Sequence, residues 1–245
     1  MIPARTSPAF RRWFTGHARA RLRGTFGAVR VSGLEAARAL AAERPLLIVA
    51  NHQSWWDPLV ALVISQALGV DGQAMMDARN LRRLPFFRLV GAFGLDLDDP
   101  RDGAVALRYA ARHLGAPGRL VWVFPQGAER PGWQRPLGFL GGAAALARLA
   151  PTCAVLPVGI RYHFGGQERP ELYVSLGAPL PASGRGEEGR RAQEDGVQAE
   201  LDRLDAALAA GAGETLPALV QRPPDRAGAW AERVLARVAG LLLRG

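Results

Sequence analysis

The stretch PLLIVANHQSWWDPLVALVISQA, residues 45–67, passes from an unbroken apolar run through a polar loop into a second apolar run. The first run, PLLIVA, is short and has no polar side chain, which predicts a strand buried on both faces. The second run begins at Pro58 and extends to about Ala67, as expected for a helix with proline in its first turn. The loop that joins the two elements carries His52 and Asp57.

The same alternation of elements continues along the chain. Further strands are expected in residues 71–78, 93–99, 119–125, 153–162 and 171–179, helices in residues 102–114 and 138–150, and a basic helical segment in residues 79–94. Strands that alternate with helices predict an α/β fold, here a single domain with a mostly parallel central sheet flanked by helices. Functional loops gather at the carboxyl ends of such strands, and the loops after Ala50 and Phe124 both lie at such ends.

The two ends of the chain differ from this core, which we place at residues 31–182. Residues 1–30 form a basic amphipathic N-terminal segment with seven arginines and no acid. The apolar side chains between the arginines suit either a helix lying on an anionic membrane interface or an amphipathic helix packed on its own domain. Residues 183–245 form a C-terminal helical segment. In it we expect a polar surface connection from Gly184 to Gly196, a helix through Leu208, and an amphipathic helix over residues 223–245.

The charge and composition restrict the class of protein. A net charge of +9, carried by arginine as the only basic residue besides histidine, implies attraction to nucleic acid, an anionic membrane or a phosphorylated substrate, although codon bias would also produce the arginines. Cys153 is the only cysteine, which excludes an internal disulfide and a cysteine-built zinc site and suits a buried core thiol. No apolar run reaches the roughly 20 residues of a membrane-spanning helix, and no secretory signal is recognisable. We therefore expect a cytoplasmic protein.

His52 and Asp57 would point to different sides of a regular helix, so a turn must lie between them. We expect Asp57 to be the N-cap of the helix and Pro58 its first residue, with the loop folding back to bring the Asp57 carboxylate to one ring nitrogen of His52.

A histidine and a carboxylate in this arrangement correspond to the base and its orienting group in a serine hydrolase triad. No G-x-S-x-G motif supplies a nucleophile, and Ser54 is poorly placed for attack. The attacking group would then be a hydroxyl of the substrate, which predicts a transferase acting on an alcohol. The alternative is that Asp57 only caps the helix and His52 is an ordinary loop residue.

Three blocks of the sequence resemble one known family. NHQSWWDP (residues 51–58), FPQGAERP (124–131) and VLPVGIRY (155–162) are similar in order and spacing to the N-H-x-S-x-x-D, F-P-E-G-T-R-S and V-P-V-x-I blocks of the glycerol-3-phosphate and lysophosphatidic acid acyltransferases. The resemblance covers about residues 30 to 180. It implies that His52 is the general base that deprotonates an acceptor hydroxyl and that Asp57 orients it. It also implies a role in phospholipid biosynthesis, with acyl-coenzyme A or acyl-carrier protein as the acyl donor. The reaction implied by the resemblance needs neither a metal nor another cofactor.

The resemblance assigns substrate contacts as well. The block FPQGAERP matches the acceptor-binding block of the family, which places Phe124, Pro125, Gln126, Gly127 and Arg130 at the acceptor. Leu156, Pro157 and Val158 fall in the block VLPVGIRY as acyl-site or core residues. Trp55 and Trp56 would wall an acyl tunnel or touch the bilayer, or else pack on the sheet.

The sequence departs from the family pattern at three places. Gln126 replaces the usual glutamate of FPQGAERP, and one extra residue there leaves either Glu129 or Arg130 at the arginine position. A further family block, I-x-V-D-R, matches FGLDLDD (residues 93–99) best, with Leu97 at its arginine and Arg101 four residues on. These changes argue against a plain glycerol phosphate acceptor. A lysophospholipid, glycerolipid, glycolipid or other lipid alcohol is then as plausible an acceptor as glycerol phosphate. Four further arginines could either form a basic patch that binds a phosphate or a head group, or lie on a solvated helix face. These are Arg79, Arg82, Arg83 and Arg88.

Two other functions remain open. Asp96 and Asp98 in the sequence DLDD would serve a metal-dependent glycosyltransferase, although the same residues suit an ordinary turn. A nucleic-acid-binding protein would explain the charge, but no helix-turn-helix, zinc finger or aromatic RNA-binding signature occurs. We expect no nucleic acid partner. The expected partners are a thioester donor, a lipid acceptor and an anionic membrane surface, with the protein peripheral on the inner face of the membrane.

Overall fold

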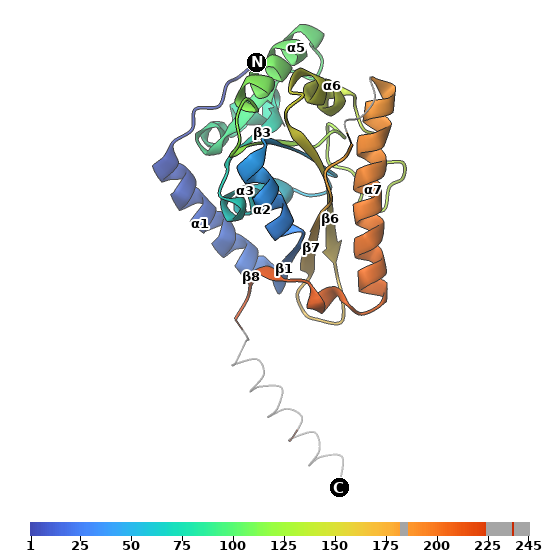
Figure 1. Cartoon of the computed structure of the whole chain (residues 1–245). Coiled ribbons are helices and arrows are strands. Elements are labelled where there is room, and N and C mark those ends of the chain that lie inside the picture. Colours follow the sequence, from blue (N-terminus) through green and yellow to red (C-terminus); the bar gives the residue numbers. More distant parts are fainter. Residues whose placement is uncertain (182–185, 224–236, 238–245) are drawn as a thin grey trace.

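The computed structural model describes residues 1–181, 186–223 and 237, in which one central sheet is covered by helices on both faces (Figure 1). The strands are β1 (Ala28–Ser32), β2 (Leu46–Ala50), β3 (Asp71–Asp77), β4 (Ala92–Leu95), β5 (Arg119–Val123), β6 (Ala154–His163), β7 (Glu171–Leu176) and β8 (Ala218–Gln221). The α-helices are α1 (Pro8–Thr25), α2 (Leu34–Glu43), α3 (Asp57–Leu68), α4 (Ala78–Arg83), α5 (Pro100–His113), α6 (Gly142–Leu149) and α7 (Glu187–Ala209). Two short 3₁₀ helices, η1 (Pro85–Val90) and η2 (Gly213–Thr215), complete the set.

The strands are ordered β4-β3-β5-β2-β6-β7-β1-β8 in the sheet. From β4 to β6 all neighbours are parallel, and the direction reverses at the β6–β7 pair. β1 is parallel to β7, and β8 closes that edge as an antiparallel strand. The expected α/β domain with a mostly parallel central sheet is confirmed.

The residues of β2 show why the sheet takes this layered form. Leu46, Ile48 and Ala50 contribute to the apolar core under α1, α2 and α3, while Leu47 and Val49 contribute to the core under α5, α6 and α7. Successive side chains of a strand point to opposite faces. An unbroken apolar strand therefore requires helices on both sides, and β2 is fully buried in the middle of the sheet.

Two helical segments differ from the sequence expectations. Residues 79–94 do not form one helical segment, because α4 ends before Pro85, the 3₁₀ helix η1 follows, and β4 begins at Ala92. Proline disfavours the helical conformation of the residue before it, and Leu84 has φ −126° and ψ 65°.

Residues 187–196 belong to α7 rather than to a surface connection. Gly196 allows this helix to lie close to β6, since a Cβ atom there would come within 3.1 Å of the Pro157 side chain. The amphipathic helix expected over residues 223–245 lies outside the described residues apart from residues 223 and 237. Strands β1 and β8 and helix α2 were not expected.

Helix α1 packs on its own domain, along α3 and η1. It buries Phe14, Ala18 and Leu22, whereas Trp13 on its outer face is 63% exposed. Within the part of the chain that the structure describes, no helix has both the length and the apolar character needed to cross a membrane. Cys153 is buried as expected, and burial raises the pKa of its thiol to about 11.

Candidate active site

The candidate site lies at the carboxyl ends of β2 and β5, which are neighbouring parallel strands with Val49 beside Val123. The helix that follows β2 covers one face of the sheet, and the helix that follows β5 covers the other face. A crevice forms where the connections of adjacent parallel strands diverge in this way, and ligands commonly bind there. His52 comes just after β2 and Phe124 just after β5, so the fold brings the two notable loops together.

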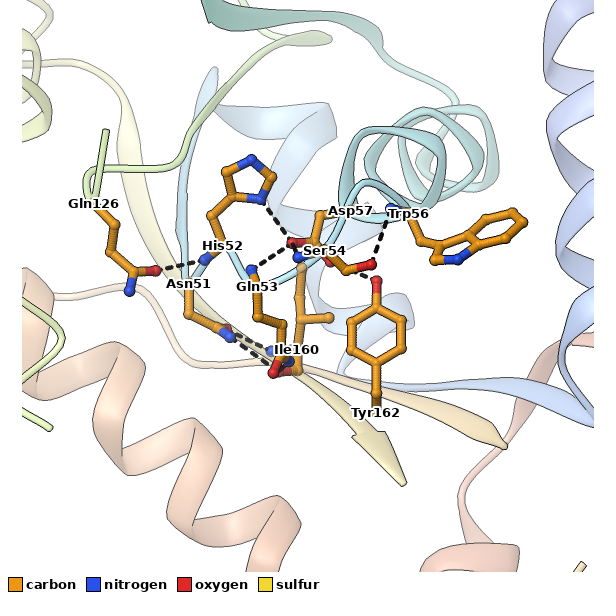
Figure 2. A network of polar contacts seen from close by, with 9 residues as sticks. All are labelled: Asn51, His52, Gln53, Ser54, Trp56, Asp57, Gln126, Ile160 and Tyr162. Atoms are coloured by element: carbon orange, nitrogen blue, oxygen red, sulfur yellow. Dashed lines mark hydrogen bonds and ion pairs between the residues drawn. The ribbon is translucent and has the colours of Figure 1, made fainter. Parts of the chain in front are cut away.

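His52 and Asp57 form the hydrogen-bonded pair that the sequence predicts. The Nδ1 atom of His52 lies 2.7 Å from Oδ2 of Asp57. The Asp57 side chain is fully buried, while the His52 side chain is 18% exposed. In Figure 2 the second ring nitrogen of His52 points away from Asp57. A carboxylate on one nitrogen sets the tautomer and leaves the other nitrogen available to accept a proton.

Asp57 is held by donors on both of its oxygens. Oδ2 accepts hydrogen bonds from the backbone amides of Gln53 at 2.8 Å and Ser54 at 3.0 Å, besides facing His52. Oδ1 accepts a 2.6 Å hydrogen bond from the hydroxyl of Tyr162. The expected N-cap role of Asp57 is wrong, because Trp56 is the cap residue and Asp57 is the first residue of α3. Its carboxylate turns back to the loop amides because these amides have no other acceptor in a chain reversal this tight.

Hydrogen bonds to distant residues fix the path of the His52 backbone (Figure 2). The His52 amide donates to Oε1 of Gln126 at 2.6 Å, and the Arg130 amide donates to the His52 carbonyl at 2.9 Å. Asn51 pairs with both backbone groups of Ile160, at 3.0 Å and 2.8 Å. The β6 strand and the β5–α6 loop therefore hold the backbone that carries the His52 ring.

A cavity of about 490 Å³ opens beside the His52 ring. The Phe124 ring lies 4.7 Å from the His52 ring, and Trp122 donates its Nε1–H to Ser65 at 2.9 Å, so that the indole presents an apolar surface with its polar atom satisfied. The apolar part of the wall comes mainly from α3, the α4–η1 segment and the central strands. It includes Ala61, Leu62, Leu84, Phe87, Val90 and Leu95. A cavity of this size and character suits a hydrocarbon chain.

The predicted substrate-binding residues divide into two groups. Trp55, Phe124 and Gly127 line the cavity with His52. The remaining members of the predicted set lie outside its lining: Pro125, Gln126, Arg130 and Arg101. Of these, Gln126 is buried behind His52, and its carbonyl is used by the His52 amide.

The extra residue in the acceptor block has a structural consequence. Both residues are exposed, but Glu129 belongs to the cavity lining and Arg130 does not. Leu97 also lines the cavity at the position where the family carries an arginine, and Arg101 sits at the start of α5. Insertion of one residue changes which side chain of the loop reaches the cavity.

The two tryptophans of the loop have different environments. Trp55 is half exposed at the cavity, while Trp56 packs edge-on against Phe26, 5.4 Å away, in the core. The guanidinium of Arg21 on α1 lies over both rings, 5.9 Å from that of Trp55 and 5.6 Å from that of Trp56. Helix α1 therefore contacts a residue of the cavity lining.

The basic patch expected in residues 79–88 is partly at the cavity. Arg79 and Arg83 line it, and Arg79 forms an ion pair with Asp77 at 2.9 Å. Arg82 is exposed outside the lining, and Arg88 donates to the Pro3 carbonyl at 3.0 Å.

The acidic run at residues 96–99 serves a turn and a helix start. Oδ1 of Asp96 accepts from the Asp98 amide at 3.1 Å, and Oδ1 of Asp99 accepts from the Arg101 amide at 2.9 Å as the cap of α5. Among the described residues no three histidine, cysteine or carboxylate side chains are grouped so that they could hold a metal ion. The geometry gives the glycosyltransferase alternative no support.

Tyr162 is the residue that the sequence analysis missed. It lies within VLPVGIRY, two positions after Ile160, so period-2 alternation along β6 places both side chains on the face that meets the His52 loop. Burial and the neighbouring Asp57 carboxylate raise the pKa of its hydroxyl. The hydroxyl therefore stays protonated and remains a donor to Asp57.

Comparison with known proteins identifies relatives of this arrangement. The family model described as Acyltransferase matches residues 28–161. The chain is also similar to the crystal structure of the 1-acyl-sn-glycerophosphate (LPA) acyltransferase, PlsC, from Thermotoga maritima. The two share 21% sequence identity with a TM-score of 0.56, over 80% of this chain and 81% of that chain. At this identity the likeness shows a common fold. No curated protein sequence matches the chain.

Proposed function

The chain belongs to the acyltransferase family, whose model matches residues 28–161, and on that premise we propose that it moves a fatty acyl group from a thioester to a hydroxyl of a lipid alcohol. The observation that carries the proposal is the 2.7 Å contact between His52 Nδ1 and Asp57 Oδ2 beside an apolar cavity. The donor class is acyl-coenzyme A or acyl-carrier protein. The acceptor class is a lysophospholipid, glycerolipid or related lipid alcohol.

The chemistry follows from the two ring nitrogens. Nε2 of His52 takes the proton of the acceptor hydroxyl while its oxygen attacks the thioester carbonyl, and Asp57 stabilises the imidazolium that forms. The tetrahedral intermediate then expels the thiolate, which receives the proton from the imidazolium. The products are an ester and a free thiol, so atoms and charge balance without a further reactant.

An acyl-enzyme intermediate is not part of this scheme. The Ser54 hydroxyl accepts a 3.3 Å hydrogen bond from the Trp56 amide inside the loop, and Cys153 lies in the core on the opposite face of the sheet. With neither residue placed to attack at the His52 ring, the acceptor itself is the nucleophile. Trp55, Phe124 and Gly127 form the wall where the acceptor and the acyl chain would meet.

The function is tested by incubating the purified protein with a radiolabelled acyl thioester and a panel of lysolipids and glycolipids. We expect a labelled ester product and an equal amount of released thiol. A reaction without acceptor controls for thioester hydrolysis. Release of thiol with no ester product from any alcohol would contradict the proposal.

We further propose that the protein works on an anionic membrane surface, with α1 facing the lipid. Arg12, Trp13 and Arg23 are exposed on the outer side of this helix, and Arg21 extends to Trp55 at the cavity. Tryptophan favours the interfacial region, and arginine is attracted to anionic head groups. Docking on this side would bring the cavity entrance to its lipid substrates.

Reversing two of the exposed charges of α1, Arg12→Glu with Arg23→Glu, is expected to weaken binding to phosphatidylglycerol vesicles at least about tenfold, since each basic residue near such a surface contributes roughly 1 kcal/mol. Vesicle co-sedimentation at fixed ionic strength measures the effect. Arg108→Glu with Arg148→Glu, which reverses two exposed arginines on α5 and α6 across the sheet, is the matched control. Equal weakening by both changes would mean that net charge, not α1, determines binding.

Tyr162→Phe is expected to reduce kcat about tenfold with little change in KM, because it removes one hydrogen bond to a charged group and frees the Asp57 carboxylate to rotate. Steady-state kinetics and thermal unfolding together measure this. Tyr173→Phe removes a comparable hydroxyl that donates to Glu171 on β7, outside the cavity, and serves as the control. A loss of stability with unchanged kcat would assign Tyr162 to folding alone.

A further inference from the structure

The charged groups at the cavity differ from those that a simple phosphate would require. The cavity lining includes the acidic side chains of Asp77 and Glu129 and the basic side chains of Arg79 and Arg83. Asp77 and Arg79 neutralise each other in their ion pair. Glu129 and Arg83 have no hydrogen bond or ion pair to any residue that the structure describes. The wall therefore presents one negative and one positive group to a ligand.

Hydrogen bonds hold the backbone on either side of Glu129. The Gly127 amide donates to the Phe124 carbonyl at 3.2 Å, and the Arg130 amide donates to the His52 carbonyl at 2.9 Å. Glu129 is thus the residue immediately before the point where the loop is anchored to the His52 backbone. Its carboxylate also lies close enough to Tyr162 to contribute, after burial and Asp57, to raising the pKa of that hydroxyl.

The arginines near this loop do not offset the Glu129 charge. Arg130 lies outside the cavity lining. Arg161 is held by the Gly132 carbonyl at 2.7 Å and by Asp205 at 2.6 Å. A phosphate monoester placed beside His52 would share the cavity with the Glu129 carboxylate, and like charges repel.

We propose that Glu129 selects an acceptor whose head group carries an ammonium group, with Arg83 receiving the anionic group of the same zwitterionic molecule. This inference rests on the proposed acyltransferase function and specifies the acceptor class. The ammonium lies against Glu129, and the anionic group of the same molecule lies towards Arg83 on α4.

The test uses three acceptors that share one acyl chain: lysophosphatidylethanolamine, its N-acetyl derivative and lysophosphatidic acid. N-acetylation removes only the ammonium charge and keeps the phosphate. For the wild type we expect kcat/KM to be about fivefold higher for the amine than for its N-acetyl derivative, the size of effect expected for a partly exposed ion pair. Glu129→Gln is expected to bring this ratio to about one, and Glu129→Lys to invert it.

Two control variants separate the roles. Glu43→Gln makes the same chemical change at the end of α2, before the amino end of β2 and hence at the opposite side of the sheet, and the ratio is expected to stay at the wild-type value. Arg83→Gln is expected to lower kcat/KM for all three phosphate-bearing acceptors without changing the ratio. An unchanged ratio in both Glu129 variants, or a wild-type preference for lysophosphatidic acid, would overturn the inference.

Failure of this inference is distinguishable from failure of the proposed function. Acyl transfer that proceeds equally well to all three acceptors overturns only the role of Glu129. The absence of ester product from any alcohol overturns the proposed function. Equilibrium binding of the amine and its N-acetyl derivative to the His52→Ala variant, followed by tryptophan fluorescence, then tests Glu129 without turnover. Equal affinities would reject its role, whereas a preference for the amine that Glu129→Gln removes would support it.

Discussion

Replacing His52 by alanine is expected to lower kcat for acyl transfer by on the order of 10³-fold, while the melting temperature changes by only a few degrees. In the proposed mechanism the variant lacks the group that accepts the proton of the attacking hydroxyl, and no other described residue of the cavity is hydrogen-bonded to a buried carboxylate in the same way. Folding is affected little because the backbone bonds of residue 52 to Gln126 and Arg130 do not involve the ring.

Single-turnover kinetics on detergent-dispersed substrate and thermal unfolding provide the two measurements. His17→Ala, which removes an exposed imidazole from α1, is the control and should retain wild-type kcat. A His52→Ala protein that loses activity only in proportion to its loss of folded structure would show that the ring is a structural loop residue.

Asp57→Asn is expected to lower kcat on the order of 10²-fold or more, because an amide that presents its NH₂ to the ring favours the wrong tautomer of His52. Unlike the change at His52, it should also destabilise the fold. The buried carboxylate oxygens of Asp57 accept hydrogen bonds from the amides of Gln53 and Ser54 and from the hydroxyl of Tyr162. In asparagine one of these oxygens is replaced by an NH₂ group, which cannot accept a hydrogen bond and would face other donors. Such a mismatch costs about 1–3 kcal/mol.

Activity and denaturant unfolding are measured on the same preparations. Asp98→Asn is the matched control, since this carboxylate is 82% exposed. The control also tests the metal-site alternative, in which Asp98 would be a ligand and its loss would abolish activity. Wild-type kcat in the Asp57→Asn variant would contradict the role of the carboxylate in the proposed mechanism.

Local sequence determined the elements that carry the site. The apolar run of β2 could only be buried on both faces, and the alternation of such strands with helices specifies the α/β class. The loop after Ala50 had to reverse the chain within a few residues, so an approach of Asp57 to His52 was predictable from spacing. The block pattern then led to the acyltransferase family, which the comparisons confirm.

Contacts between distant parts of the chain decided the rest. Glu129 rather than Arg130 reaches the cavity because the loop after β5 is anchored to the His52 carbonyl, a contact that no local pattern encodes. Tyr162 joins the Asp57 carboxylate from a position 105 residues away, and Asn51 bonds Ile160 from 109 residues away. Local propensity specifies which segments are strands and helices, but the direction of a side chain in a loop depends on long-range hydrogen bonds. For that reason the approach of Asp57 to His52 was visible in the sequence, while the hydrogen bond from Tyr162 and the placing of Glu129 at the cavity were decided only by the tertiary structure.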